Sequence, residues 1–354
     1  MLQQWLDRFS WVGLLLWVLR VAVVVLIVVG TYNTLTSGRY TAANWATLFV
    51  SGLAQGSIYA LIALGYSLVY GILFMINFAH GEVFMAGAFT AVFVANSFSK
   101  SGFLDRQPIL AILILLAVAM VISMVVATLL ERIAYRPLRN APRLVPLITA
   151  IGASFFLQYT FRGLYGDGFK SYPTVTALRG NLDIFGFAVP VVQVVVFVAA
   201  VIMMFGLYWF VERTKTGKSM RAVAEDKEIA ALMGIDVNRV IVTAFAVGGM
   251  MAGAAGIFRG LYQPQGVSFI MGFIPGLKAF TAAVLGGIGN IPGAMIGGLF
   301  LGVFESIGPN LILEGLGIPG ANQLKDAIAI VLLVLVLIFR PQGILGERLA
   351  QEKA

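Results

Sequence analysis

The sequence contains no cysteine and a single histidine, His80, among its 354 residues. Without cysteine there is no disulfide framework, thiolate metal site or cysteine nucleophile, and one histidine excludes a metal site built from several histidines. Charge is scarce as well, since Asp, Glu, Lys and Arg make up 11% of the chain, whereas soluble domains carry about 25%. Water is therefore not the main solvent of this protein.

Groups for enzymatic chemistry are also missing. The sequence offers no paired carboxylates and no serine elbow at usable spacing. Gly217-Lys218-Ser219 resembles the end of a phosphate-binding loop, but the position where that motif needs its leading glycine is Glu212. We therefore expect no enzymatic activity, no catalytic residue, and no metal or cofactor bound by this chain.

Apolar residues are abundant, at 60% of the chain. They form runs long enough to cross a bilayer, which takes roughly 20 residues of helix, and only helices or closed barrels span lipid. The sequence therefore predicts an all-α membrane protein, a polytopic bundle of about ten transmembrane helices, some of them broken or short. The expected spans are 11–29, 45–70, 82–98, 109–131, 144–162, 189–211, 240–262, a short 276–287, 291–313 and 324–339.

The net charge of +8 comes from basic residues in short loops, which indicates membrane topology and not a nucleic-acid-binding face. The densest loops are 132–143 and 213–239. Two spans separate them, so both can lie in the cytoplasm, where Lys and Arg are favoured, with segment 163–186 outside. If segment 276–287 counts as a crossing, both termini are cytoplasmic.

Two regions, 71–82 and 274–289, place helix breakers and polar groups at membrane depth, a pattern typical of a translocation path. Asn77, His80 and Glu82 either line that path or cap a broken helix, with Asn77 accepting from freed backbone amides. Lys278 needs a partner in the membrane. Either Glu305 or Glu82 pairs with it, or it contacts the substrate.

Further polar side chains lie on span 45–70. Gln55, Ser57 and Tyr59 offer neutral hydrogen bonds to a zwitterion, but such residues equally join helices. Two glycine series have spacings that favour close helix packing. They are Gly248, Gly249, Gly253 and Gly256 on one span, and Gly293, Gly297, Gly298 and Gly302 on another. Phe74 and Phe78 are expected to face lipid or pack within the bundle.

The longer basic loop contains an amphipathic segment, 221–236. Its Ala, Glu and Leu favour helix, and Gly234 is a natural stop. Ile229, Leu232 and Met233 form a small apolar face beside Glu225 and Asp226. The pattern predicts a short cytoplasmic helix that docks into a groove on another protein.

This loop resembles the coupling loop of ABC-importer permeases, and residues 53–346 as a whole resemble the LivH-type permeases of branched-chain amino-acid ABC importers. The motifs that carry the resemblance are Ile-Asn-Phe-Ala-His-Gly-Glu at 76–82, Glu-Arg-Ile-Ala-Tyr-Arg-Pro-Leu at 131–138, Ala-Glu-Asp at 224–226, Lys-Ala-Phe-Thr-Ala-Ala-Val-Leu-Gly-Gly-Ile-Gly at 278–289, Ile-Pro-Gly-Ala at 291–294 and Arg-Pro-Gln-Gly-Ile-Leu-Gly at 340–346.

The resemblance implies a permease subunit of the bacterial inner membrane, embedded in lipid, that carries a neutral amino acid. It implies as partners a LivM-like second permease, two cytoplasmic ATPases and a periplasmic solute-binding protein. ATP and Mg would be used by the ATPase subunits. The residues expected to couple this chain to them are Glu225, Asp226, Ile229, Ala230, Ala231, Leu232 and Gly234.

These assignments divide the chain into three parts. Residues 1–43 form an N-terminal extension whose extra helix contains Arg20, a costly residue in mid-membrane that tilts, snorkels or packs against a partner. Residues 44–346 form the permease domain with its cytoplasmic coupling loop 213–239. Residues 347–354 form a cytoplasmic tail.

The sequence is compatible with two alternative functions. The same machine can carry urea or short amides, because the binding protein sets most of the selectivity. A secondary transporter that works without ATP also suits broken helices and intramembrane charges, but it has no need for a cytoplasmic docking helix.

Overall fold

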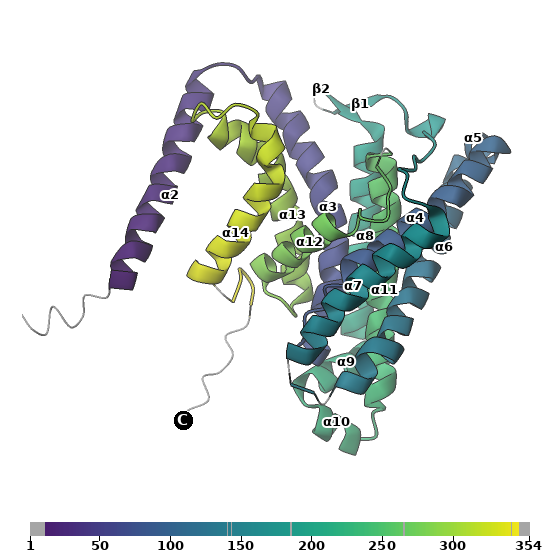
Figure 1. The fold of residues 1–354 in the computed structure, drawn as a ribbon. Helices are drawn as coiled ribbons and strands as arrows, with labels where there is room; N and C mark the ends of the chain where they lie inside the picture. Colours follow the sequence, from purple (N-terminus) through teal and green to yellow (C-terminus); the bar gives the residue numbers. More distant parts are fainter. Residues whose placement is uncertain are drawn as a thin grey trace, which may run out of the picture.

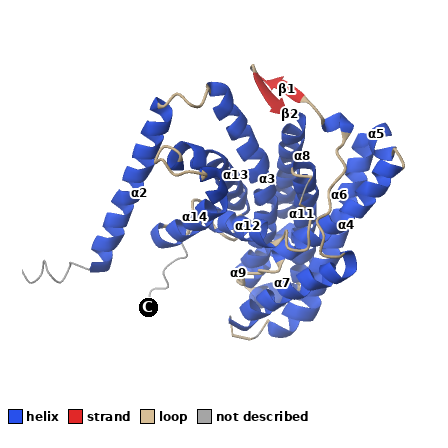
Figure 2. Cartoon of the chain, turned by 45° about the horizontal axis from the view of Figure 1, so that its top comes forward, coloured by secondary structure: helices blue, strands red, loops and turns tan. Residues whose placement is uncertain are grey.

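The computed structural model describes residues 11–346 except 140, 143, 185, 265 and 341, so the predicted tail 347–354 lies outside the described residues. The chain is almost entirely helical (Figures 1 and 2). The α-helices are α2 (Trp11–Thr36), α3 (Ala42–Leu73), α4 (His80–Lys100), α5 (Phe103–Arg106), α6 (Pro108–Leu130), α7 (Leu144–Tyr165), α8 (Val191–Arg213), α9 (Lys215–Glu225), α10 (Lys227–Leu232), α11 (Val237–Tyr262), α12 (Phe273–Gly286), α13 (Ile291–Gly308) and α14 (Lys325–Phe339).

Shorter elements complete the description. Two π-helices, η1 (Glu131–Tyr135) and η4 (Pro309–Leu313), continue α6 and α13. The 3-10 turns are η2 (Arg136–Leu138), η3 (Thr176–Leu178) and η5 (Ala321–Leu324), and the strands are β1 (Asn181–Ile184) and β2 (Phe187–Pro190). The two strands form one antiparallel hairpin in which Leu182 is opposite Val189.

The membrane spans confirm the predicted fold class. In the described part of the chain, nine helices are long and apolar enough to cross a membrane, and α12 is a shorter tenth. At 14 residues, α12 is about 21 Å long, less than the roughly 30 Å of a hydrocarbon core.

Helix α3 is the centre of the bundle, with α13, α11, α12 and α8 packed around it (Figure 1). In its most apolar stretch 83% of the residues are buried, against 6% for α2 and 11% for the segment that contains α14. The exposed residues of these two peripheral helices are mainly Leu, Val and Ile. Side chains of this kind are stable in an apolar environment, which suits the periphery of a membrane-embedded bundle.

The contact between α3 and α13 depends on small residues. A Cβ on Gly302 would overlap the backbone of Gly56, and one on Gly298 would overlap the backbone of Ala60. Gly249 and Gly253 of α11 lie equally close to α6. Both predicted glycine series therefore permit close approach of helix backbones.

Gly302→Ala is expected to destabilise the protein because its methyl group must push α3 and α13 apart. Overpacking of this kind costs about 1–3 kcal/mol. Gly152→Ala on α7 is the matched control, since a Cβ there has no neighbour within 4 Å. The measurement is the unfolding temperature in mild detergent, which should fall for the first variant only; equal temperatures would contradict the packing argument.

The bundle has two distinct ends. Helices α9 and α10 lie at one end, and the β1–β2 hairpin lies at the other (Figure 1). The two basic loops meet at the α9–α10 end, where Arg139 Nη1 donates to Asn238 Oδ1 at 2.5 Å. Their placement on one side of the membrane agrees with the two spans that separate them.

The N-terminal helix α2 extends beyond the predicted 11–29 and packs on the π-helix η4 and the residues that follow it. Asn33 Nδ2 donates to the Gly315 carbonyl at 3.0 Å, and Thr34 Oγ1 donates to the Asn310 carbonyl at 3.4 Å. Arg20 lies over the ring of Phe339, 4.7 Å from its centroid. Within this chain, Arg20 of α2 thus packs against an aromatic side chain of α14.

Candidate functional site

The predicted docking segment forms two helices, so the expectation of one continuous helix was wrong. Asp226 is the residue that separates them: it adopts an extended conformation (φ −152°, ψ 117°), and its Oδ1 accepts from the backbone amides of Glu228 at 2.8 Å and Ile229 at 2.9 Å. An aspartate N-cap of this kind starts a new helix. Asp226 thus has a structural role, while Glu225 ends α9 with its side chain exposed.

Helix α10 presents its apolar side chains outward. Leu232 is 87% exposed, Met233 78% and Ile229 60%, whereas Ala230 is buried against the bundle. Ala231 is exposed, and Gly234 follows with φ +84°, a left-handed conformation that ends the helix. Ile229, Leu232 and Met233, here called the α10 patch, therefore form an apolar surface outside the membrane spans, as the sequence predicted.

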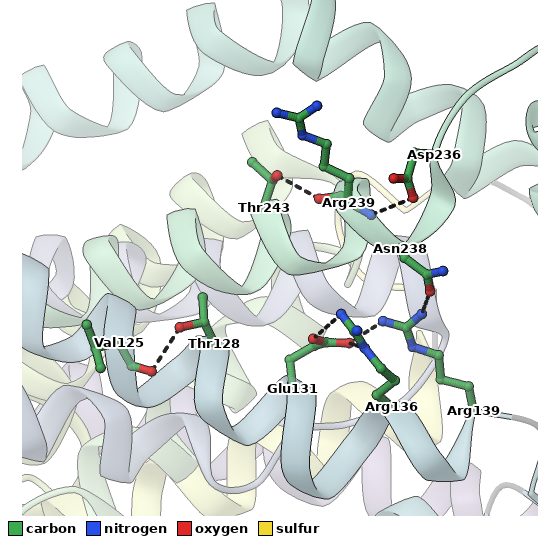
Figure 3. A network of polar contacts seen from close by, with 9 residues as sticks. All are labelled: Val125, Thr128, Glu131, Arg136, Arg139, Asp236, Asn238, Arg239 and Thr243. Atoms are coloured by element: carbon green, nitrogen blue, oxygen red, sulfur yellow. Dashed lines mark hydrogen bonds and ion pairs between the residues drawn. The ribbon is translucent and has the colours of Figure 1, made fainter.

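A buried carboxylate fixes the neighbouring loop (Figure 3). Glu131 is fully buried and pairs with Arg136 at 3.3 Å and with Arg139. Arg139 also bonds to Asn238 in the first turn of α11. Because a buried charge is stable only when it is paired, this cluster locks η1 to the end of the loop that holds α10.

Sequence reasoning used Glu131 only as part of a family motif and assigned it no role. The sequence does contain a pattern that marks this cluster: an acidic residue at the end of a long apolar run, followed within eight positions by three arginines. That pattern predicts an ion-pair cluster at a membrane boundary.

The first predicted helix break is present at residues 74–79, between α3 and α4. Asn77 does not cap the broken helix, contrary to one of the two interpretations. Its Oδ1 accepts from Tyr135 Oη at 2.6 Å, and α4 begins without a side-chain cap. The N-cap position of α4 is occupied by Ala79, two residues beyond Asn77, so the Asn77 side chain is not the one placed over the first amides of the helix.

Glu82 and His80 are buried at the start of α4. Glu82 Oε1 accepts from Gln158 Nε2 at 2.7 Å and from Ser154 Oγ at 3.3 Å, both on α7. The His80 ring meets the Tyr66 ring edge-on, with centroids 4.9 Å apart. Both residues therefore contact neighbouring helices, and Glu82 is in the first turn of α4, where a helix favours an anion.

Lys278 is the centre of a second polar group. Its Nζ lies 2.5 Å from Glu305 Oε1 and 2.5 Å from Asp326 Oδ1, and it donates to Tyr59 Oη at 3.3 Å. Glu82 is not a partner of Lys278. The ion pairs connect α12 with α13 and with α14. Helix α14 is otherwise largely exposed.

The same group extends along α3 to α11. Gln55 Nε2 donates to Tyr59 Oη at 2.7 Å, and Arg259 Nη1 donates to Gln55 Oε1 at 3.4 Å. Ser57 does not join them, because its hydroxyl donates to the Ala54 carbonyl of its own helix. The structure thus brings together Gln55, Tyr59 and Lys278, and it shows Glu305, one of the two predicted partners of Lys278, in the same group. It adds Arg259 and Asp326, which sequence reasoning did not place there.

The two interrupted regions lie against each other in the bundle. Gly81 of α4 faces Gly272 and Gly276 so closely that a Cβ on Gly81 would strike the Gly272 carbonyl. The ring of Phe280 on α12 lies 5.8 Å from that of Phe78, between centroids. Broken helices paired in this way are typical of transport proteins. Among the residues that the structure describes, no three acidic or histidine side chains gather as a metal site.

Within the residues that the structure describes, nine helices long enough to span a membrane surround a central pair of interrupted helices, which is the architecture of a polytopic membrane protein. The chain belongs to the family described as the branched-chain amino acid transport system permease component, whose model matches residues 48–337. The resemblance inferred from the motifs is confirmed. The match begins after α2, so the N-terminal helix lies outside it.

Characterised relatives agree with this family. The high-affinity branched-chain amino acid transport system permease protein BraD of Pseudomonas aeruginosa is 43% identical over 301 residues, covering 84% of this chain and 94% of the relative. The corresponding protein LivH of Escherichia coli K12 is 39% identical over 304 residues, with the same coverage of 84% and 94%. A probable LivH of Methanocaldococcus jannaschii is 27% identical over 307 residues, covering 83% and 90%.

Proposed function

We propose that this chain is the transmembrane permease subunit of an ABC importer that carries branched-chain or other neutral amino acids into the cytoplasm. Family membership supports the transport role, and the α10 patch supports its dependence on partner subunits. Three large apolar side chains that project from the bundle outside the membrane spans are costly in water unless a partner covers them. In this proposal the partner is one of two ATPase subunits.

The remaining subunits follow from the same proposal. A related second permease completes the channel, and a periplasmic binding protein delivers the solute. ATP and Mg are used by the ATPases, and this chain performs no hydrolysis. The α9–α10 end, with its two basic loops, faces the cytoplasm, as does each chain terminus, because Lys and Arg in short loops favour that side.

The test is purification of the chain from its native membrane in mild detergent, followed by identification of the copurifying proteins. Recovery of a second permease and ATPase subunits supports the proposal. Proteoliposomes that contain the purified assembly and binding protein should take up radiolabelled leucine only with ATP inside. Preferential uptake of urea or acetamide would change the cargo, and uptake without ATP would overturn the mechanism.

A further inference from the structure

One pair of side chains joins the docking helix to the broken segment 74–79. Lys227, the first residue of α10, places its Nζ 5.9 Å from the centroid of the Phe74 ring. Phe74 is the first residue after α3 and is half exposed. A cation at this distance from an aromatic face is attracted to it. The helix that carries the α10 patch therefore contacts the break directly.

Phe74 also sets the direction in which the chain leaves α3. Its φ of +56° is left-handed, and no other non-glycine residue in the described part of the chain has a positive φ. Its backbone amide donates to the Tyr70 carbonyl at 2.8 Å and so caps the helix. A residue stays in such a conformation only where its surroundings hold it there.

The other end of the segment contacts the centre of the bundle. Asn77 bonds to Tyr135 of η1, and the Phe78 ring packs against Phe280. Phe280 is two residues beyond Lys278 on α12. Residues 74–79 thus lie between the α10 end of the molecule and the interrupted helix that holds the buried ion pairs.

We propose that Phe74 is a positioning residue for energy coupling: its ring, held against Lys227, transmits a displacement of α10 to residues 74–79 and, through the Phe78–Phe280 contact, to α12. This inference rests on the proposed function, since it assumes that an ATPase moves α10. Chains of packed side chains and short segments between rigid helices are structures that can carry energetic coupling between two sites.

Phe74→Gly tests the proposal in the complete assembly reconstituted into proteoliposomes. Glycine adopts positive φ without strain, so the end of α3 is retained while the ring is removed. We expect all subunits to copurify and basal ATP hydrolysis to persist, while leucine uptake per ATP hydrolysed falls about fivefold or more. Phe74→Trp keeps an aromatic face and should retain wild-type coupling.

Changes at Lys227 provide an independent readout. Lys227→Met should reproduce the coupling defect, whereas Lys227→Arg should not, because a guanidinium also binds ring faces. Phe156→Ala, an exposed aromatic on α7, is the matched control and should transport as the wild type does.

The outcomes separate this inference from the function on which it rests. Wild-type transport per ATP by the Phe74→Gly assembly would overturn the inference alone, as would dissociation of its subunits. Leucine uptake by the wild-type protein without ATP would instead overturn the proposed function, whatever the behaviour of Phe74.

Discussion

Leu232→Glu is expected to release the ATPase subunits from the permease while leaving the permease in the membrane. Leu232 is 87% exposed, the highest exposed fraction in the α10 patch, so the fold of the free chain does not depend on its side chain. At a docked interface the same position would be covered. A carboxylate there would lose apolar contact and would be buried without a partner.

The size of the effect follows from interface energetics. Hot-spot side chains of an interface cost about 2 kcal/mol or more when truncated, which corresponds to roughly a thirtyfold loss of affinity, and we expect Leu232 to be such a residue. The measurement is the ratio of ATPase to permease after affinity purification in mild detergent, with membrane content of the permease scored separately. Leu232→Met keeps an apolar side chain of similar volume and should retain the complex.

Lys218→Glu is the matched control for charge. It lies on α9 in the same loop, is exposed, and makes a larger change in charge than Leu232→Glu. If both variants lose the ATPase equally, a general charge effect explains the result and the α10 patch is not the dock. An unchanged ratio for Leu232→Glu would also remove α10 from the interface.

The spans and the interruptions between them were predictable because each depends on local composition. Long apolar runs fix where helices cross lipid, and polar residues within them mark the breaks. The exposed apolar face of α10 was predictable for the same reason. Ile229, Leu232 and Met233 recur at the i, i+3 and i+4 spacing of one helix face, directly after the charged residues 225–228.

The partners of the polar side chains were not predictable, because they depend on how distant segments cross. Lys278 pairs with Asp326, 48 positions along the chain and on another helix. Asn77 accepts from Tyr135, 58 positions along the chain, a contact that local sequence does not reveal. The division of 221–236 into two helices was missed because Asp226 stands among good helix formers, and its capping geometry outweighs their propensity.

Lys278→Met is expected to lower stability strongly. Lys278 is buried and pairs with both Glu305, which is buried, and Asp326, which is 60% exposed. Removing one partner of a buried ion pair costs about 3–5 kcal/mol because the other charge is left uncompensated. Asp326 can be hydrated and Glu305 cannot, so most of the cost arises at Glu305. The unfolding temperature in detergent should fall well below that of the wild type.

The double variant Lys278→Met with Glu305→Gln identifies the cause. It removes the orphaned carboxylate and keeps a side chain of similar size, so it should recover most of the lost stability, since a buried pair replaced by neutral groups is often tolerated. A double variant no more stable than Lys278→Met alone would show that the lysine contributes through its other contacts, with Tyr59 and Asp326.

Transport by the stable double variant then decides between the two roles left open for Lys278. A structural ion pair predicts wild-type uptake once stability is restored, because the charges only hold α12, α13 and α14 together. A pathway role predicts a stable assembly that hydrolyses ATP and fails to move the solute, since the charges that interact with it are gone. Stability and uptake measured on the same preparation therefore separate the packing of this cluster from its contribution to transport.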